Sequence, residues 1–350
     1  MTAHTCSLGI PGRTESGVGH DGSAEALPEL PAMRCADAAR MRDEPLKASA
    51  VRYSRFLLLE MPGPWGPSAL EGTHLETGTA RQLASLAAAA DAHVLLIRRP
   101  GRHPSAGPSA RNEPRAWALA DTAPGTERVV WGSWRDPADL LGLDLAATVT
   151  GTTGPAGPQQ LALVCTNGKR DQCCAVRGRP VAAAIAAGTD WDTWECSHLG
   201  GHRFAATIML LPTGDMFGWL DPESAVEVTR RFAAGQLMLS HYRGRCGQPV
   251  PVQAALHAAA VRLGDFNRDA IRVEWARCLP ADGGTGTAGQ APDEGDRWEV
   301  RVTHQATRGR EDAYHLVLAG AKLTPTFLSC ADGIPRAEVY YEALSFTQVG

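Results

Sequence analysis

The sequence lacks the long apolar segment that a membrane-spanning helix needs. Its most apolar run, ATIMLLP at 206–212, is far shorter than the roughly 20 residues that cross a bilayer. A strong charge of one sign is also missing, because the formal net charge is −4 and no basic block stands out. Neither nucleic acid nor a membrane is therefore an expected partner. Residues 1–23 have no basic and apolar signal pattern, so we expect a cytoplasmic protein.

Cysteine, by contrast, is frequent, with nine cysteines in 350 residues. An odd number does not suit a complete disulfide framework, and cytoplasmic thiols stay reduced. Clustered cysteines in such a protein indicate metal or redox chemistry more often than structural disulfides. No recognisable pair of catalytic carboxylates supports a glycosidase.

The length allows two or three folded domains, since domains usually contain about 100–200 residues. The first residues are rich in Gly, Ser and Pro and are predicted to form a flexible leader, and a Gly-, Pro- and Thr-rich stretch at 148–160 is a predicted linker. We predict a leader at 1–30, an N-terminal α/β domain at 31–150, a central α/β domain at 151–245, and a C-terminal helix and antiparallel sheet at 246–350.

Apolar periodicity predicts an α/β fold class. In the N-terminal and central domains, short apolar strands alternate with Ala-rich helical segments, whereas in the C-terminal region a single helix precedes four alternating stretches. The expected helices lie at 80–92, 179–188, 221–235 and 252–264. The expected strands lie at 56–59, 93–101, 115–123, 127–134, 160–166, 204–212, 270–278, 297–305, 313–321 and 337–346, with a hairpin-like turn and strand at 213–220.

Two segments of the central domain gather four Cys and two His: CTNGKRDQCC at 165–174 and WECSHLGGHRF at 194–204. Both follow predicted strands, so we expect loops on a rigid frame. Eight residues separate Cys165 from Cys174, so a loop can fold back and present both thiols to one point. His198 and His202 have the H-x3-H spacing, with two glycines between them that let the backbone wrap closely.

Two thiolates and two imidazoles make four ligands. This set suits a closed tetrahedral zinc site, and it equally suits a two-iron cluster with two ligands on each iron. Cys173 and Cys174 are neighbours whose side chains point in different directions, so we expect only one of them to face the site. Cys196 and His198 form a C-x-H that resembles half of a Rieske motif, but the second half, C-x-x-H, is absent downstream.

The remaining solitary cysteines have a simpler interpretation. Buried cysteine commonly acts as a small apolar residue, so Cys246, Cys278 and Cys330 are expected to be core residues.

At the two Cys/His segments the chain resembles the sucrase/ferredoxin-like family. The resemblance is carried by CTNGKRDQCCAVRGRPVAAAI and WECSHLGGHRFAATIMLLPTGDMFGWL, and earlier by RDEPLKASA, LLLEMPGPWGPSAL and LLIRRPGR. It covers most of 31–245 and, more loosely, the rest of the chain. The central domain of this family is similar to the thioredoxin-like [2Fe-2S] ferredoxins, which implies such a domain at 151–245.

The resemblance implies a [2Fe-2S] cluster held by Cys165, Cys174, His198 and His202. The chain departs from the family pattern at Asn167, where members often have His, and at Cys173, where they have a residue other than Cys. The implied function is one-electron transfer or redox sensing with a redox partner protein. Such a protein is more an electron carrier than a stand-alone enzyme.

Two further interpretations stay open: a zinc-binding structural module, and a thioredoxin-like thiol oxidoreductase that uses Cys165 or Cys173 together with Cys174. The C-x-x-C motif expected of the latter is absent. Arg170 and Arg203 lie next to the ligand segments. Either they raise the cluster potential, or they pair with Asp171 and Glu195 on the surface.

Overall fold

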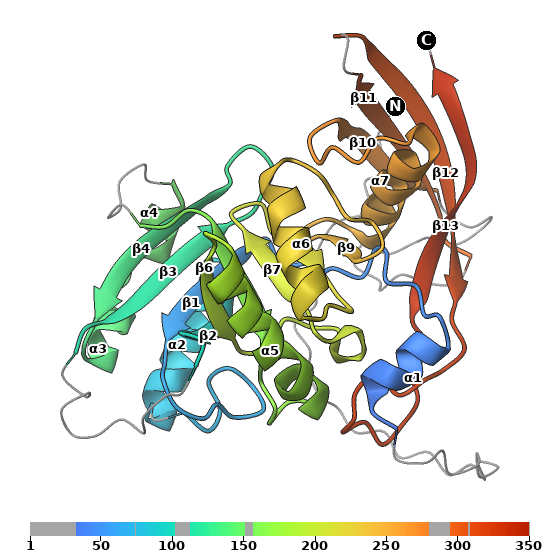
Figure 1. Cartoon of the computed structure of the whole chain (residues 1–350). Coiled ribbons are helices and arrows are strands. Elements are labelled where there is room, and N and C mark those ends of the chain that lie inside the picture. The colour runs from blue at the N-terminus through green and yellow to red at the C-terminus, as the bar shows by residue number, and fades with distance from the viewer. Residues whose placement is uncertain are drawn as a thin grey trace.

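The structure, a computed structural model, describes residues 33–73, 75–101, 113–150, 157–279, 295–306 and 309–349 (Figure 1). The predicted leader at 1–30 lies outside the described residues. Within the described portion of the chain, no helix is both long and apolar enough to cross a membrane.

The fold is α/β, as predicted, with one nine-stranded mixed sheet and one separate four-stranded antiparallel sheet. The large sheet has the order β4-β3-β1-β2-β6-β5-β7-β8-β9. Its strands are β1 (Arg55–Glu60), β2 (Ala92–Arg98), β3 (Arg115–Asp121), β4 (Arg128–Trp134), β5 (Leu161–Cys165), β6 (Asp192–Cys196), β7 (Ile208–Leu211), β8 (Asp215–Phe217) and β9 (Tyr242–Arg245). The β1–β2 and β5–β6 pairs are parallel, and the other neighbours are antiparallel.

The large sheet continues across the predicted domain boundary at 150/151. The link is a short antiparallel pairing of β2 with β6, in which Ile97 lies opposite Cys196 and Arg98 opposite Glu195. The strands that carry the Cys/His segments are therefore central in the sheet.

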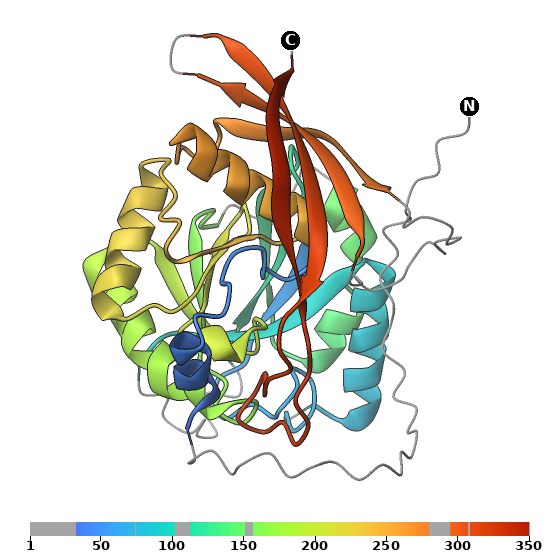
Figure 2. The same cartoon turned by 90° about the vertical axis from the view of Figure 1, so that its right-hand side faces the viewer.

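Helices pack on the large sheet and on the small one (Figures 1 and 2). Around the large sheet lie α2 (Thr77–Ala89), α3 (Pro137–Leu141), α4 (Leu145–Thr150), α5 (Gln172–Gly188), the 3-10 turn η2 (His202–Phe204) and α6 (Pro222–Ala233). The short helix α1 (Cys35–Met41) packs against η2 and the start of α5. Next to the small sheet lies α7 (Val250–Leu263). The small sheet contains β10 (Ile271–Leu279), β11 (Arg297–Gln305), β12 (Glu311–Lys322) and β13 (Val339–Val349), in sequence order.

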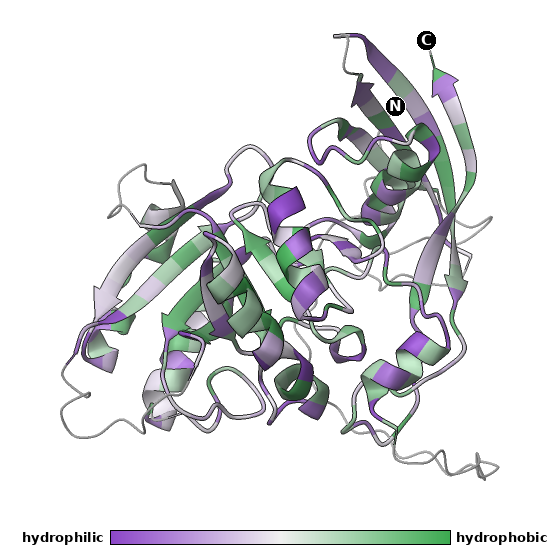
Figure 3. Cartoon of the chain, in the orientation of Figure 1, coloured by the Kyte–Doolittle hydropathy of each residue, from purple (hydrophilic) through white to green (hydrophobic). Residues whose placement is uncertain are grey.

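The central strand β5 shows why an unbroken apolar run marks a strand that is covered on both faces. Successive side chains of a strand point to opposite faces. Leu161, Leu163 and Cys165 join one core cluster, whereas Ala162 and Val164 join a second cluster under α5 and α6. Figure 3 shows this contrast between apolar central strands and helices with polar outer faces.

The predicted elements are largely present, and the main correction concerns α5. The sequence predicts a helix only at 179–188, with its proline near the start. The helix instead begins at Gln172, and Pro180 lies in its interior. The Asp171 carboxylate accepts the backbone N–H of Cys173 at 2.8 Å and so caps a start seven residues earlier. Cys173 and Cys174 therefore lie in the first helical turn and not in a loop.

Candidate metal centre

The candidate site lies where two parallel strands end side by side. In the β5–β6 register Cys165 lies opposite Cys196, so the loops that follow the two strands leave the sheet at the same edge. One loop leads into α5 and the other into η2. Ligands in open α/β sheets bind at such an edge, outside the carboxyl ends of the strands.

A glycine allows α5 to approach β5 closely. A Cβ atom on Gly178 would lie 2.1 Å from the carbonyl oxygen of Cys165, far closer than van der Waals contact allows, so only glycine fits at this position. Because the helix backbone lies directly against the strand end, Cys174 in the first turn of α5 is held beside Cys165. Both thiols are 1% exposed.

The two histidines are presented by a turn that glycine makes possible. Gly200 and Gly201 have φ angles of 81° and 71°, in the left-handed region that glycine adopts without strain. Beyond this turn η2 begins at His202, whose ring stacks on that of His198 with centroids 4.0 Å apart.

Side chains of all four predicted ligand residues gather at this place. One ligand atom each from Cys165, Cys174 and His198 lies within 4.8 Å of the other two. His202 Nδ1 lies 3.8 Å from the Cys174 Sγ atom. The arrangement offers two sulfur and two nitrogen donors to a metal or cluster.

Metal ligation needs thiolate and neutral imidazole, and the pKa shifts of Cys165 and His202 favour these forms, whereas Cys174 holds the proton shared with Cys165 in the metal-free site. A hydrogen bond from Cys174 holds the pKa of the Cys165 thiol well below its usual value, against the effect of burial. Because Cys174 donates the proton of this hydrogen bond to Cys165, the pKa of Cys174 is raised. Burial, followed by the nearby His198, lowers the pKa of His202 to about 3, so this imidazole is neutral near pH 7.

A buried arginine that sequence analysis missed supports the histidine turn. The Arg243 guanidinium donates to the carbonyl oxygen of Gly200 at 3.0 Å and to the hydroxyl of Ser49 at 3.0 Å. A Cβ atom on Gly201 would lie 2.5 Å from its Nη2 atom. Burial lowers the pKa of Arg243 to about 9, so it remains a cation at neutral pH. No local pattern in the sequence distinguishes this arginine from the others.

Of the two interpretations of Arg203, the one in which it pairs with Glu195 on the surface is wrong. Arg203 is buried and pairs with Glu44 at 2.7 Å and with Glu338. Glu195 is also buried and pairs with Arg98 at 2.7 Å.

Arg170 is exposed, and the Asp171 carboxylate caps α5. Of the two arginines, only Arg203 is thus a buried cation near the candidate site.

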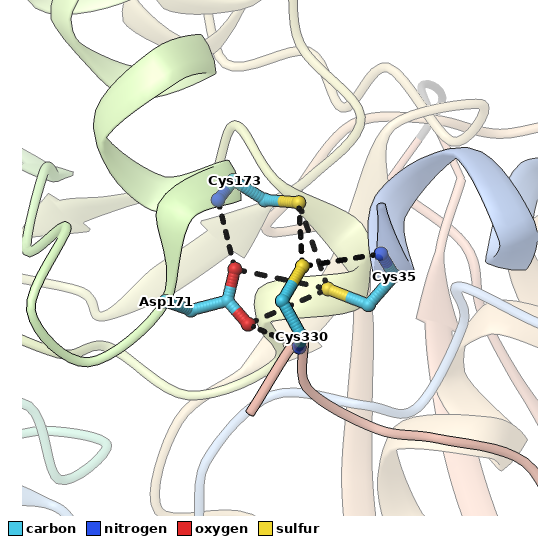
Figure 4. Close-up of side chains that lie close together, drawn as sticks. All are labelled: Cys35, Asp171, Cys173 and Cys330. Carbon is cyan, nitrogen blue, oxygen red and sulfur yellow. Dashed lines mark hydrogen bonds between the residues drawn. The ribbon is translucent and has the colours of Figure 1, made fainter. Parts of the chain in front are cut away.

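The other cysteines in the described part of the chain fall into three groups. Cys196 and Cys246 are buried in the apolar core, and burial raises the pKa of each. Cys278 is half-buried. Cys330, expected in the core, is instead exposed and lies next to Cys173 and Cys35 (Figure 4). Cys173 therefore points away from Cys165 and toward a second group of thiols.

Comparisons with known proteins give one match. Residues 46–244 match a family model described as sucrase/ferredoxin-like. No curated protein and no solved structure matches significantly.

Proposed function

The chain belongs to the sucrase/ferredoxin-like family, and we propose that it holds a [2Fe-2S] cluster between Cys165, Cys174, His198 and His202. Its function is then one-electron transfer or redox sensing. The observation that carries the proposal is the convergence of two buried thiols and two stacked imidazoles at one sheet edge.

The donor set fits this group chemically. Thiolates are soft ligands that suit iron–sulfur clusters, and a two-iron cluster accepts two protein ligands on each iron. The shifts in the pKa of Cys165 and His202 favour a thiolate and a neutral imidazole, the forms that bind metal. When bound, the cluster supplies a site that accepts or donates a single electron.

The surrounding residues would raise the reduction potential. Imidazole in place of thiolate removes negative charge from the site, as in Rieske centres. The buried cations of Arg203 and Arg243 lie near the histidine turn and favour the more negative, reduced state. The half-buried His198 is the most exposed of the four proposed ligands. Electrons would therefore pass to a redox partner protein through the exposed side of this imidazole.

A second candidate is a structural zinc module. Three of the donors lie within 4.8 Å of one another, a spacing that also suits a single tetrahedral ion. A thiol oxidoreductase has less support, because exchange with an external disulfide needs an accessible thiol and Cys165 and Cys174 are both buried.

Metal and sulfide analysis of anaerobically purified protein separates these candidates. We expect about two iron and two acid-labile sulfide per chain and a visible spectrum in the wild type. Cys165→Ser should lose the iron, the sulfide and the visible spectrum. A wild type without iron and sulfide, whose zinc content falls in Cys165→Ser, would support the zinc module instead.

A further inference from the structure

A second group of metal-ligating side chains lies outside the candidate cluster site. The Sγ atom of Cys173 is 3.6 Å from that of Cys35 and 3.5 Å from that of Cys330, and Asp171 lies beside them (Figure 4). One ligand atom from each of these four residues lies within 4.8 Å of the other three.

We propose that Cys35, Cys173, Cys330 and Asp171 bind one zinc ion. Thiolates select zinc and other soft cations over magnesium or calcium. Two zinc–sulfur bonds of about 2.3 Å at a tetrahedral angle place their sulfurs about 3.8 Å apart, close to the two separations in this group. A disulfide would use only two of the three sulfurs and would need them about 2 Å apart.

The Asp171 carboxylate has room for the metal. Its Oδ1 atom accepts the backbone N–H of Cys173 at 2.8 Å. Its Oδ2 atom accepts the backbone N–H of Cys330 at 2.7 Å and the hydroxyl of Ser329 at 2.9 Å. An ionised carboxylate has about four acceptor positions. The Cys35 thiol lies 3.5 Å from Oδ2 and also donates to this carboxylate, so the fourth position becomes free for a metal when Cys35 binds as a thiolate. The same donors fix the orientation of the carboxylate, as partners of metal ligands commonly do.

The sulfurs also have surroundings typical of metal thiolates. The backbone N–H of Cys35 donates to the Cys330 sulfur at 3.3 Å. Cys173 lies in the first turn of the 17-residue helix α5, where the helix dipole favours negative charge. Cys35, Cys173 and Asp171 are buried, whereas Cys330 is exposed and leaves a path by which the ion can enter.

The site joins three distant segments of the chain. Cys35 opens α1, Cys173 lies in α5, and Cys330 belongs to the connection between β12 and β13, which runs beside α1 in both views (Figures 1 and 2). Cys35 and Cys330 lie outside residues 46–244, the region that matches the family model. The zinc ion would therefore fasten both flanking segments to the central sheet in this chain.

The first test is the zinc content of the full chain, expressed with zinc in the medium. We expect about one zinc per chain in the wild type and in Cys278→Ser, a control in a cysteine outside both groups. Cys330→Ser should lose this zinc and keep its iron, because Cys330 is exposed and is not one of the four proposed cluster ligands. Wild-type protein without zinc would overturn the proposal. Zinc that persists in Cys330→Ser but disappears in Cys165→Ser would also overturn it, because the ion would then occupy the other site.

The second test is X-ray absorption at the zinc edge, combined with chelator competition. The spectrum should show three sulfurs at about 2.3 Å and one oxygen at about 2.0–2.2 Å. Ser329→Ala removes a donor to Asp171 without touching a sulfur, and it should weaken zinc affinity by roughly 10–100-fold. An unchanged affinity, or a spectrum with fewer than three sulfurs, would contradict the assigned ligands. A disulfide between two of the three cysteines in protein expressed with zinc and purified anaerobically, found by alkylation and mass spectrometry, would contradict them too.

Discussion

At the scale of single residues, the adjacent cysteines Cys173 and Cys174 have different surroundings. Neighbours in a helix point about 100° apart, so one thiol can face the sheet edge while the other faces the flanking segments. Cys174 lies beside Cys165 and His202, and Cys173 lies beside Cys35 and Cys330. Two successive positions thus contribute to two separate groups of metal-ligating side chains.

This difference predicts opposite effects of the same substitution. Cys174→Ser removes a proposed cluster ligand and should abolish bound iron and the visible spectrum. Cys173→Ser should keep both and lose zinc. Iron, sulfide and zinc per chain are measured in both variants. Retention of the visible spectrum in Cys174→Ser together with its loss in Cys173→Ser would mean that Cys173, and not Cys174, holds the cluster.

A buried carboxyl group in β8 predicts a pH-dependent stability. Burial raises the pKa of Asp215, although Tyr242 donates a hydrogen bond to it at 2.7 Å. A carboxyl with a raised pKa in the folded state stabilises the protein below its unfolded pKa of about 4, and this contribution is lost as pH rises through the folded pKa. Asp215→Asn should therefore gain stability relative to the wild type as pH rises from about 4.

The control for this experiment is Asp221, whose pKa is shifted in the opposite direction to that of Asp215. The backbone N–H of Ser224 donates to Asp221 at the start of α6 and lowers the pKa of this carboxyl. Asp221→Asn should lose stability relative to the wild type as pH rises toward the unfolded pKa of about 4, and the difference should stay constant above it. Thermal unfolding at several pH values measures both. Parallel curves for wild type and Asp215→Asn would show that Asp215 does not titrate differently in the folded state.

At the scale of elements, the close contact between α5 and β5 positions the site. Strands and helices were predictable because their apolar periods of two and 3.6 are local properties of the sequence. The start of α5 was not predictable in the same way. Proline is common in the first turn of a helix, so Pro180 suggested a start at 179. The helix is instead capped by the Asp171 carboxylate. The first turn that follows Asp171 shows no apolar periodicity that would have revealed it.

The contact predicts that Gly178→Ala damages the site. The new methyl group would overlap the carbonyl oxygen of Cys165 and push α5 away from the strand end. We expect a loss of about 1–3 kcal/mol in the free energy of unfolding, and reduced iron content, because overpacking forces backbone shifts. Gly142→Ala is the control, since its Cβ atom would lie 3.6 Å from the nearest atom with an ordinary backbone φ of −83°. Equal unfolding midpoints and iron contents in the two variants would exclude this role for Gly178.

At the scale of the whole molecule, contacts between residues far apart in sequence hold the site in place. Arg203 of the histidine turn pairs with Glu44 before the first strand and with Glu338 before the last one. Arg243 binds the backbone of the segment around Ser49. Such contacts have no local signature. The sequence therefore predicted the four candidate ligands, through their spacing and family resemblance, and pointed to Arg203, but it predicted neither the partners of Arg203, nor Arg243, nor the grouping of Cys35 with Cys330.

The buried Arg203 predicts a large effect on stability. Arg203→Gln removes one of the two arginine partners of the buried Glu44 carboxylate, which remains paired with Arg42, and should cost about 1–3 kcal/mol. Arg231→Gln removes an exposed pair with Glu227 and should cost at most about 0.5 kcal/mol. Both are compared by unfolding in the Cys165→Ser background, so that loss of bound iron does not contribute. Similar costs for the two variants would show that burial of the Arg203 pair does not determine its contribution.

Histidine ligation of the proposed cluster is tested most directly by pulsed electron paramagnetic resonance of the reduced protein, prepared with and without ¹⁵N-labelled histidine. The expected spectrum contains couplings to two coordinated histidine nitrogens, and these couplings change with the label. His202→Cys protein that retains a cluster should show only one such nitrogen. A reduced wild-type spectrum that is identical with and without the label would contradict ligation by His198 and His202.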